Sequence, residues 1–118
     1  MWNIERLEIY SRVCDLIPRV YGLIKMLPSE EKFALGSQLR RAVVSIKSNM
    51  IEGSGKRTSK EFISYLGNAM GSLKEVRGQI EIGNDLKYFE GVDEVAEIRR
   101  IERMLFGYIK YIEKKDVR

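Results

Sequence analysis

Apolar residues recur at alternating spacings of four and three in four separate segments of this chain, and this pattern constrains the fold most strongly. The segments predict helices over residues 4–27, 37–52, 58–86 and 93–115. A 4-3 spacing places its residues along one side of an α-helix, as in helix bundles. The connections are short, so neighbouring helices are expected to pack antiparallel. The sequence therefore predicts an all-α, antiparallel up-down four-helix bundle, with residues 1–118 forming a single domain.

The apolar stripes define the predicted core. In chain order they are Leu7, Tyr10, Cys14, Ile17, Tyr21 and Ile24; then Leu39, Val43, Ile46 and Met50; then Phe62, Leu66, Ala69, Leu73, Val76 and Ile80; and finally Ile98, Ile101, Leu105, Ile109 (or Tyr108) and Ile112.

Local signals delimit the helices. Pro28 ends the first helix and precedes a short turn at Glu30–Lys32, and the run Gly53-Ser54-Gly55 ends the second helix. Thr58 and Glu61 have the spacing of a capping box, which predicts the start of the third helix.

Composition excludes several classes of chemistry. The chain has 118 residues, a single cysteine and no histidine. It therefore lacks the residues for an internal disulfide, a Cys/His zinc site, a histidine-dependent nucleophile or the Glu-x-x-His di-iron signature. Cys14 lies on an apolar stripe and is expected to be a small buried hydrophobe. No catalytic residue, metal ligand or cofactor is predicted, and the chain is not expected to be an enzyme.

No secretory signal and no apolar run of about 20 residues is visible, so the protein is expected to be cytoplasmic and without a membrane partner.

More apolar surface is present than one bundle core needs. The first helix adds Ile9, Leu16 and Leu23, with Val13, Val20 and Leu27, and the second adds Val44 and Ile51. The third carries Gly67, Gly71 and Gly78 on one side, each costing about 1 kcal/mol relative to alanine within a helix. These features predict a homo-oligomer or close helix packing, against the alternative of tolerated surface glycines.

A basic stripe runs along the fourth helix. Arg99, Arg100, Arg103, Lys110 and Lys114 fall within an arc of about 100°, which contains no acidic residue. Such a stripe is the footprint expected of a protein that binds a phosphate backbone, as RNA or DNA would offer. The alternative is an ordinary solvated face. The net charge of +4 permits nucleic-acid binding without requiring it.

Two smaller basic groups are further candidates. Lys56, Arg57 and Lys60 follow the glycine-rich turn, where backbone N–H groups near a helix start could bind an anion. The alternative is a plain capped turn. Arg40 and Lys47 share a face with Val44 and Ile51, a mixture that suits a protein interface as well as RNA.

Polar residues on the second helix predict a structural network that fixes the helix register. Arg41, Ser45 and Glu52 share one side with Ser48, and Asn49 borders the apolar stripe. Arg41 and Glu52 are eleven residues apart, too far to pair along one helix, so each is expected to meet a partner on another helix or subunit.

The same helix carries a family resemblance. Its Ser-Gln-Leu-Arg-Arg-Ala start, its Ser45-Ile46 pair and its Ser48-Asn49-x-x-Glu52-Gly53 end resemble a family of four-helix-bundle proteins encoded in intervening sequences of bacterial large-subunit ribosomal RNA genes. The similarity continues through Lys60-Glu61-Phe62 and Ala69-x-Gly71-Ser72-Leu73-x-Glu75 to Leu86-x-Tyr88. Family members often have proline where this chain has Lys47, so the second helix is expected to be continuous.

The resemblance implies a pentameric ring around a central channel. It extends to the accessory variability determinant of diversity-generating retroelements, a basic pentamer that binds nucleic acid and a reverse transcriptase. We therefore expect a non-catalytic oligomeric protein that binds nucleic acid, structured RNA in particular, through basic helix surfaces. The alternatives are a reverse-transcriptase accessory scaffold and a protein-interaction oligomer without nucleic-acid binding.

Overall fold

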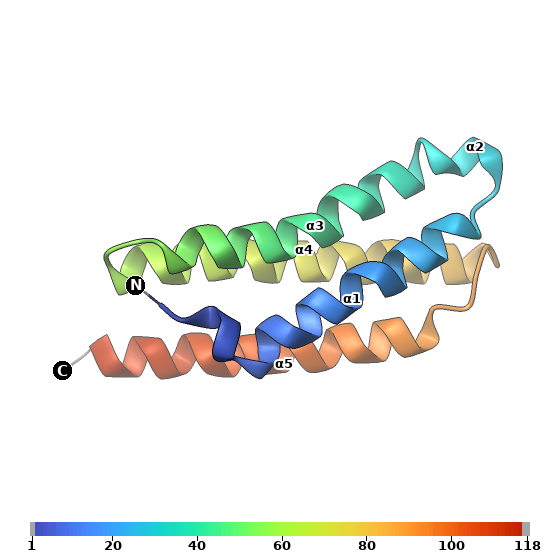
Figure 1. Cartoon of the computed structure of the whole chain (residues 1–118). Helices are drawn as coiled ribbons and strands as arrows, with labels where there is room; N and C mark the ends of the chain where they lie inside the picture. The colour runs from blue at the N-terminus through green and yellow to red at the C-terminus, as the bar shows by residue number, and fades with distance from the viewer. Residues whose placement is uncertain (1, 117–118) are drawn as a thin grey trace.

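The computed structural model describes residues 2–116, and all of their regular secondary structure is helical. A short 3-10 helix η1 (Ile4–Arg6) precedes α1 (Glu8–Lys25), α2 (Ser29–Lys32), α3 (Leu35–Ser54), α4 (Ser59–Asp85) and α5 (Val92–Asp116). Figure 1 shows the four long helices lying alongside one another, with α2 as a single turn between α1 and α3. The predicted all-α four-helix bundle is confirmed.

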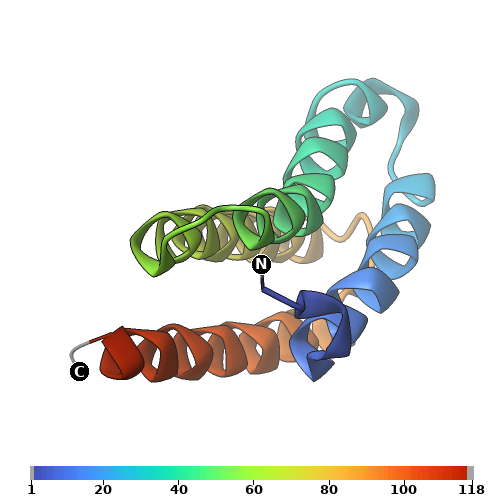
Figure 2. The same cartoon turned by 60° about the vertical axis from the view of Figure 1, so that its left-hand side comes forward.

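Side-chain contacts define how the helices pair. Gln38 near the start of α3 bonds Gln79 near the end of α4, whereas Ser45 further along α3 bonds Ser72 earlier in α4. Contacts that advance along one helix and recede along the other require the two helices to run in opposite directions. Helix α3 packs against α1 and α4, and α5 packs against α4 and α1. Figure 2 shows α3 and α4 close together, with α5 below them and α1 at the right of the view.

The core contains three of the four predicted stripes. Every stripe residue of α3 and α4 is almost fully buried, as are the α5 residues Ile98, Ile101, Leu105 and Ile112. Tyr108 and Ile109 are only partly buried at the edge of this core.

Helix α1 presents a different face to the core from the predicted one. Its buried residues are Ile9, Val13, Leu16, Val20, Leu23 and Ile24. Of the predicted stripe only Ile24 is buried, while Leu7, Tyr10, Ile17 and Tyr21 are partly buried at its edges. The residues taken as a second, interface-forming face of α1 are therefore core residues. Cys14 is also only partly buried, so its prediction as a buried hydrophobe was wrong.

Helix boundaries agree with the local signals except at the N-terminus. The Thr58 hydroxyl accepts a hydrogen bond from the Glu61 backbone N–H at 3.1 Å, which confirms Thr58 as the predicted helix cap. The Glu61 carboxylate accepts from the Thr58 hydroxyl at 2.9 Å, whereas in a full capping box it would accept from the Thr58 backbone N–H. The predicted first helix is interrupted at Leu7, whose extended backbone (φ −83°, ψ 138°) separates η1 from α1. Helix α3 is continuous through Lys47, as the sequence predicted.

Candidate nucleic-acid interface

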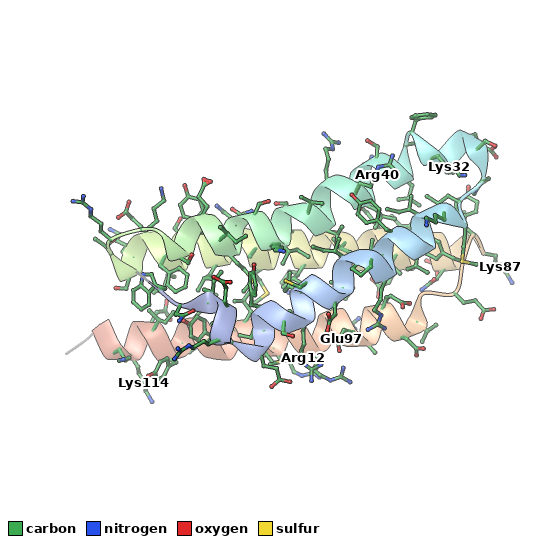
Figure 3. All side chains as sticks on the ribbon, viewed as in Figure 1. Arg12, Lys32, Arg40, Lys87, Glu97 and Lys114 are labelled. Carbon is green, nitrogen blue, oxygen red and sulfur yellow. The ribbon has the colours of Figure 1, made fainter. Side chains whose placement is uncertain are left out.

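The basic stripe lies on the outer side of α5. Arg99, Arg100, Arg103, Lys110 and Lys114 are all exposed, because the opposite side of the helix carries the core residues Ile98, Ile101, Leu105 and Ile112. Figure 3 shows Lys114 near the C-terminal end of α5, pointing away from the bundle. The five cations thus form one surface, which we name the α5 stripe.

The cations of the α5 stripe differ in their ion pairs: Arg100 pairs with the mostly buried carboxylate of Glu97, whereas Arg99 and Lys110 pair with exposed glutamates. Arg99 lies 3.5 Å from Glu81, Lys110 lies 3.5 Å from Glu113, and Arg100 bonds Glu97. Arg103 and Lys114 have no ion-pair partner among the side chains of residues 2–115. Exposed pairs such as those of Arg99 and Lys110 contribute only about 0–1 kcal/mol, so a phosphate can compete for these two cations.

Three glutamates of α5 (94, 97 and 102) join it to neighbouring helices, and Glu97 also bonds Arg100 of α5 itself. Glu97 accepts hydrogen bonds from Arg12 of α1 at 3.0 and 3.1 Å, and Glu94 pairs with Arg19 at 3.3 Å. Figure 3 shows Arg12 and Glu97 meeting between the two helices. On the other flank, Glu102 pairs with Arg77 of α4 at 2.7 Å.

The Arg77–Glu102 pair is the best shielded of these bridges. Burial by itself would raise the pKa of the Glu102 carboxyl, but the hydrogen bonds and charges of Arg77 and Lys74 outweigh it and lower that pKa. The same hydrogen bond raises the pKa of the Arg77 guanidinium. Both groups therefore remain charged at neutral pH. Because Glu94, Glu97 and Glu102 pair with other arginines, none of them neutralises Arg103 or Lys114, the two cations of the α5 stripe that have no ion-pair partner among the described side chains.

Two exposed aromatic rings beside the α5 stripe were not among the predicted site residues. Phe106 is 58% exposed and Tyr111 is 56% exposed. Lys110 Nζ lies 5.3 Å from the centre of the Phe106 ring, and Lys115 Nζ lies 5.4 Å from that of Tyr111. Sequence spacing alone could have placed Phe106 beside the α5 stripe, because a residue three positions after Arg103 lies on the same side of a helix.

The second basic group lies at the turn between α3 and α4. Arg57 and Lys60 are exposed, and Lys56 Nζ lies 5.2 Å from the centre of the Tyr65 ring. The Gly55 and Lys56 N–H groups donate to carbonyl oxygens of α3. These two N–H groups are therefore not free to bind an anion. Gly53 is required for packing, since a Cβ there would lie 2.6 Å from the Cβ of Tyr65.

Arg40 and Lys47 contact neighbouring elements. Arg40 donates a hydrogen bond to the Lys32 carbonyl at 3.0 Å, which fastens α2 to α3. Lys47 lies across from α1, with its Nζ 5.6 Å from the centre of the Tyr10 ring. The Cys14 thiol and the Tyr10 phenol, which gain negative charge as the pH rises, raise the pKa of the Lys47 ammonium. Val44 and Ile51, on the same side of α3, are 42% and 48% exposed.

Only some residues of the predicted polar network form hydrogen bonds with one another. Asn49 donates hydrogen bonds to the Ser45 carbonyl at 2.9 Å and hydroxyl at 3.0 Å, and the Ser45 hydroxyl bonds that of Ser72 on α4 at 2.9 Å. Arg41 and Glu52 are exposed and take no part in these bonds within the described residues. Arg41 instead borders a shallow polar hollow lined by Gln38, Ser45 and Glu75.

The outer glycines of α4 are not contacted by the rest of the bundle. A Cβ at Gly67, Gly71 or Gly78 would meet nothing within 4 Å. The expectation that close packing within the bundle explains them is therefore wrong, while packing against a second copy stays a prediction.

The basic groups occupy different parts of the bundle. The α3–α4 turn lies at the same end as the last turns of α5, where Phe62 and Tyr108 have ring centres 6.1 Å apart. Figure 3 places Arg40, with Lys32 and Lys87, at the opposite end from Lys114. Lys56, Arg57 and Lys60 could thus extend the α5 stripe, whereas Arg40 could not.

The described part of the chain shows neither a cluster of metal ligands nor a membrane-spanning helix. Among the side chains of residues 2–115, no three cysteine, aspartate or glutamate groups gather as a metal site would require. None of the described helices is both long and apolar enough to cross a membrane.

Comparisons with known proteins agree with this architecture. A crystal structure of a protein of unknown function from the S23 ribosomal protein family of Bacteroides thetaiotaomicron matches with a TM-score of 0.80 at 21% identity. The match covers 86% of this chain and 98% of that chain, and at this identity it shows the shared fold alone. No curated protein matches the chain significantly. The model of the 23S rRNA-intervening sequence protein family matches residues 5–107, and the chain therefore belongs to this family.

Proposed function

We propose that this protein is a non-catalytic, oligomeric nucleic-acid-binding protein that binds structured RNA through the α5 stripe. The observation that supports this proposal is the division of charge on α5. Its glutamates at 94, 97 and 102 bridge to α1 and α4, and Glu97 also pairs with Arg100. The other stripe cations are exposed, and they make either exposed pairs (Arg99, Lys110) or no ion pair among the side chains of residues 2–115 (Arg103, Lys114). A surface of this kind adds little to folding and is suited to a polyanion.

Phosphate neutralisation supplies the binding free energy in this proposal. Arg99 and Lys114 are fifteen residues apart, which corresponds to about 22 Å along the helix axis. A backbone lying along the α5 stripe could therefore contact several cations in succession. Affinity should fall steeply as salt rises, and sequence preference should be low, because phosphate contacts carry no sequence information. Lys56, Arg57 and Lys60 would extend this surface at one end.

Oligomerisation is the second part of the proposal. The half-exposed Val44 and Ile51 on α3 and the open glycine side of α4 provide two surfaces that a second copy could cover. Repeating the α5 stripe around an oligomer raises the affinity for an RNA that reaches several copies. The pentameric state is taken from the family resemblance, and light scattering would measure it.

Exposed apolar residues favour a second candidate function, that of a protein-interaction scaffold. Phe33, which follows α2, is 90% exposed, and Met26, Leu86 and Val92 are also exposed. A protein partner such as a reverse transcriptase would bind this surface rather than the α5 stripe. Such a scaffold would show no salt-dependent RNA binding.

Charge reversal on the α5 stripe tests the proposal. We would measure the fluorescence anisotropy of a labelled RNA stem-loop between about 50 and 200 mM salt. The variant Arg103→Glu/Lys110→Glu/Lys114→Glu removes three outer cations and only one exposed pair, that of Lys110 with Glu113. We expect weaker binding and a slope of log affinity against log salt that is smaller in magnitude by about two to three.

A matched control removes the same charge elsewhere. Lys25→Glu/Lys32→Glu/Lys87→Glu also lowers the net charge from +4 to −2, since each replacement changes the charge by two. These three lysines are exposed and lie outside the α5 stripe. Stronger loss of binding in the α5 variant supports the proposal. Equal loss in both variants, or no RNA binding by the unmodified protein, would refute it.

A further inference from the structure

We infer that the α5 stripe binds unpaired nucleotides, whose bases stack on Phe106 and Tyr111 while the neighbouring cations hold their phosphates. This inference rests on the proposed function and specifies the class of RNA. It starts from the exposure of these two rings, since a site that only neutralises phosphates gains nothing from solvent-exposed aromatic groups.

The two rings border the cations on opposite sides. At about 100° per residue, Phe106 lies some 60° to one side of Arg103, and Tyr111 lies some 80° to its other side. Gly107 lies between the two rings, and a Cβ there would meet nothing within 4 Å. No side chain therefore occupies the surface between the rings, and this surface is flanked by cations and by aromatic faces.

Shallow hollows adjoin both rings. One, between α4 and α5, is lined by Met70, Lys74, Arg99, Glu102, Arg103 and Phe106. The other is lined by Gly107, Lys110, Tyr111, Glu113 and Lys114. Each contains one carboxylate, and Glu102 is paired with Arg77 while Glu113 is paired with Lys110. Each hollow therefore combines an apolar wall with an excess of cations, as a base and its phosphate require.

Tyr111 is held in place by a row of rings that leads from the core. Trp2 stacks on Phe62 at 4.7 Å, Phe62 meets Tyr108 edge-on at 6.1 Å, and Tyr108 stacks near Tyr111 at 6.5 Å between centres. A ring supported in this way loses little freedom when a base stacks on it, so more of the stacking free energy contributes to binding.

In the free protein, a lysine ammonium lies over one face of each ring. Lys110 lies over Phe106, and Lys115 lies over Tyr111. A base that stacks on the covered face of Phe106 displaces Lys110, which is then free to contact the phosphate of that nucleotide. A base paired within a duplex has no exposed face to offer, so this exchange is available only to unpaired nucleotides.

The experiment compares a labelled single-stranded oligouridine with the same strand annealed to its complement. We expect Phe106→Ala and Tyr111→Ala each to weaken single-strand binding about fivefold or more. Duplex binding and the salt slope should stay unchanged, because no charge is removed. Phe106→Tyr keeps the ring and should keep the affinity. Phe33→Ala is the matched control, because Phe33 is an exposed aromatic residue outside the α5 stripe.

The outcomes separate this inference from the proposed function. If both strands bind with a steep salt dependence that Phe106→Ala and Tyr111→Ala leave intact, the stacking inference fails and phosphate binding stands. If the unmodified protein binds neither strand, both fail. Light scattering on the same samples supplies a third result: if Phe106→Ala changes the oligomer mass, a second copy covers the ring, and the stacking inference is overturned.

Discussion

The inner and outer sides of the α4–α5 pair differ in almost every physical property. The inner side is closely packed and contains Leu73, Ile80, Ile98, Ile101 and Leu105, all fully buried. The outer side contains exposed glycines, unpaired or weakly paired cations and the exposed ring of Phe106. The acidic residues along the flanks bind the arginines of neighbouring helices. Stability therefore depends on the inner side and the flanks rather than on the outer side.

Adjacent residues on α5 provide the strongest test of this comparison. Leu105 is fully buried and Phe106 is largely exposed. We expect Leu105→Ala to lower the free energy of unfolding by about 2–5 kcal/mol, since it leaves a cavity in the core. Phe106→Ala should change it by less than about 0.5 kcal/mol. Urea denaturation measures both, and similar losses in the two variants would contradict the comparison.

Glycines on α4 give the next largest difference. A Cβ at Gly83 would overlap the buried ring of Phe89, whereas a Cβ at Gly71 meets nothing within 4 Å. We expect Gly83→Ala to destabilise the bundle by about 1–3 kcal/mol, because the ring must move within a packed core. Gly71→Ala should raise stability by up to about 1 kcal/mol. Thermal denaturation would show opposite shifts, and a loss of stability in Gly71→Ala would mean that this side is packed against another copy.

The flank pair between Arg77 and Glu102 should give a smaller, pH-dependent effect. The pKa of Glu102 is lower in the folded protein than its ordinary value of 4.5, so its stabilising effect is complete above that value and is lost as the pH falls through the folded pKa. We expect Glu102→Gln to cost about 1–2 kcal/mol at pH 7 and progressively less below about pH 4.5. Urea denaturation across this range tests it.

Glu113→Gln is the control for the flank pair. Glu113 is exposed and pairs only with Lys110 among the described residues, so we expect its replacement to leave stability nearly unchanged at either pH. An equal loss in the two glutamine variants would show that the flank pair has no special role in the fold.

Periodicity was sufficient to predict the packing of three helices but not of α1. Helices α3, α4 and α5 each carry one dominant apolar stripe, and that stripe is buried. Helix α1 carries two overlapping stripes that both have helical spacing, so periodicity alone could not identify the inward one. The structure buries the stripe with Val13, Leu16 and Val20, and leaves the one with Tyr10, Ile17 and Tyr21 at the edge.

The candidate site was predictable in part. The shared face of Arg99, Arg103 and Lys110 follows from residue spacing along one helix. The spacing could not show which charges are already used, because Glu97 and Glu102 find their arginines on α1 and α4. Those contacts depend on how the helices pack. The exposure of Phe106 and Tyr111 likewise required the packed bundle, since an aromatic residue on an amphipathic helix is equally compatible with the core.

The central claim is that the α5 stripe binds nucleic acid, and the variant Arg103→Gln tests it most directly. The measurement is the salt dependence of RNA stem-loop binding, compared between the unmodified protein and the variant. Arg103 lies in the middle of the α5 stripe and has no ion-pair partner among the side chains of residues 2–115, so its replacement disturbs none of the described pairs and should leave the urea midpoint unchanged. We predict that the magnitude of the salt slope falls by about one, which corresponds to one lost phosphate contact. An unchanged slope and affinity would contradict the assignment of the α5 stripe as the nucleic-acid interface.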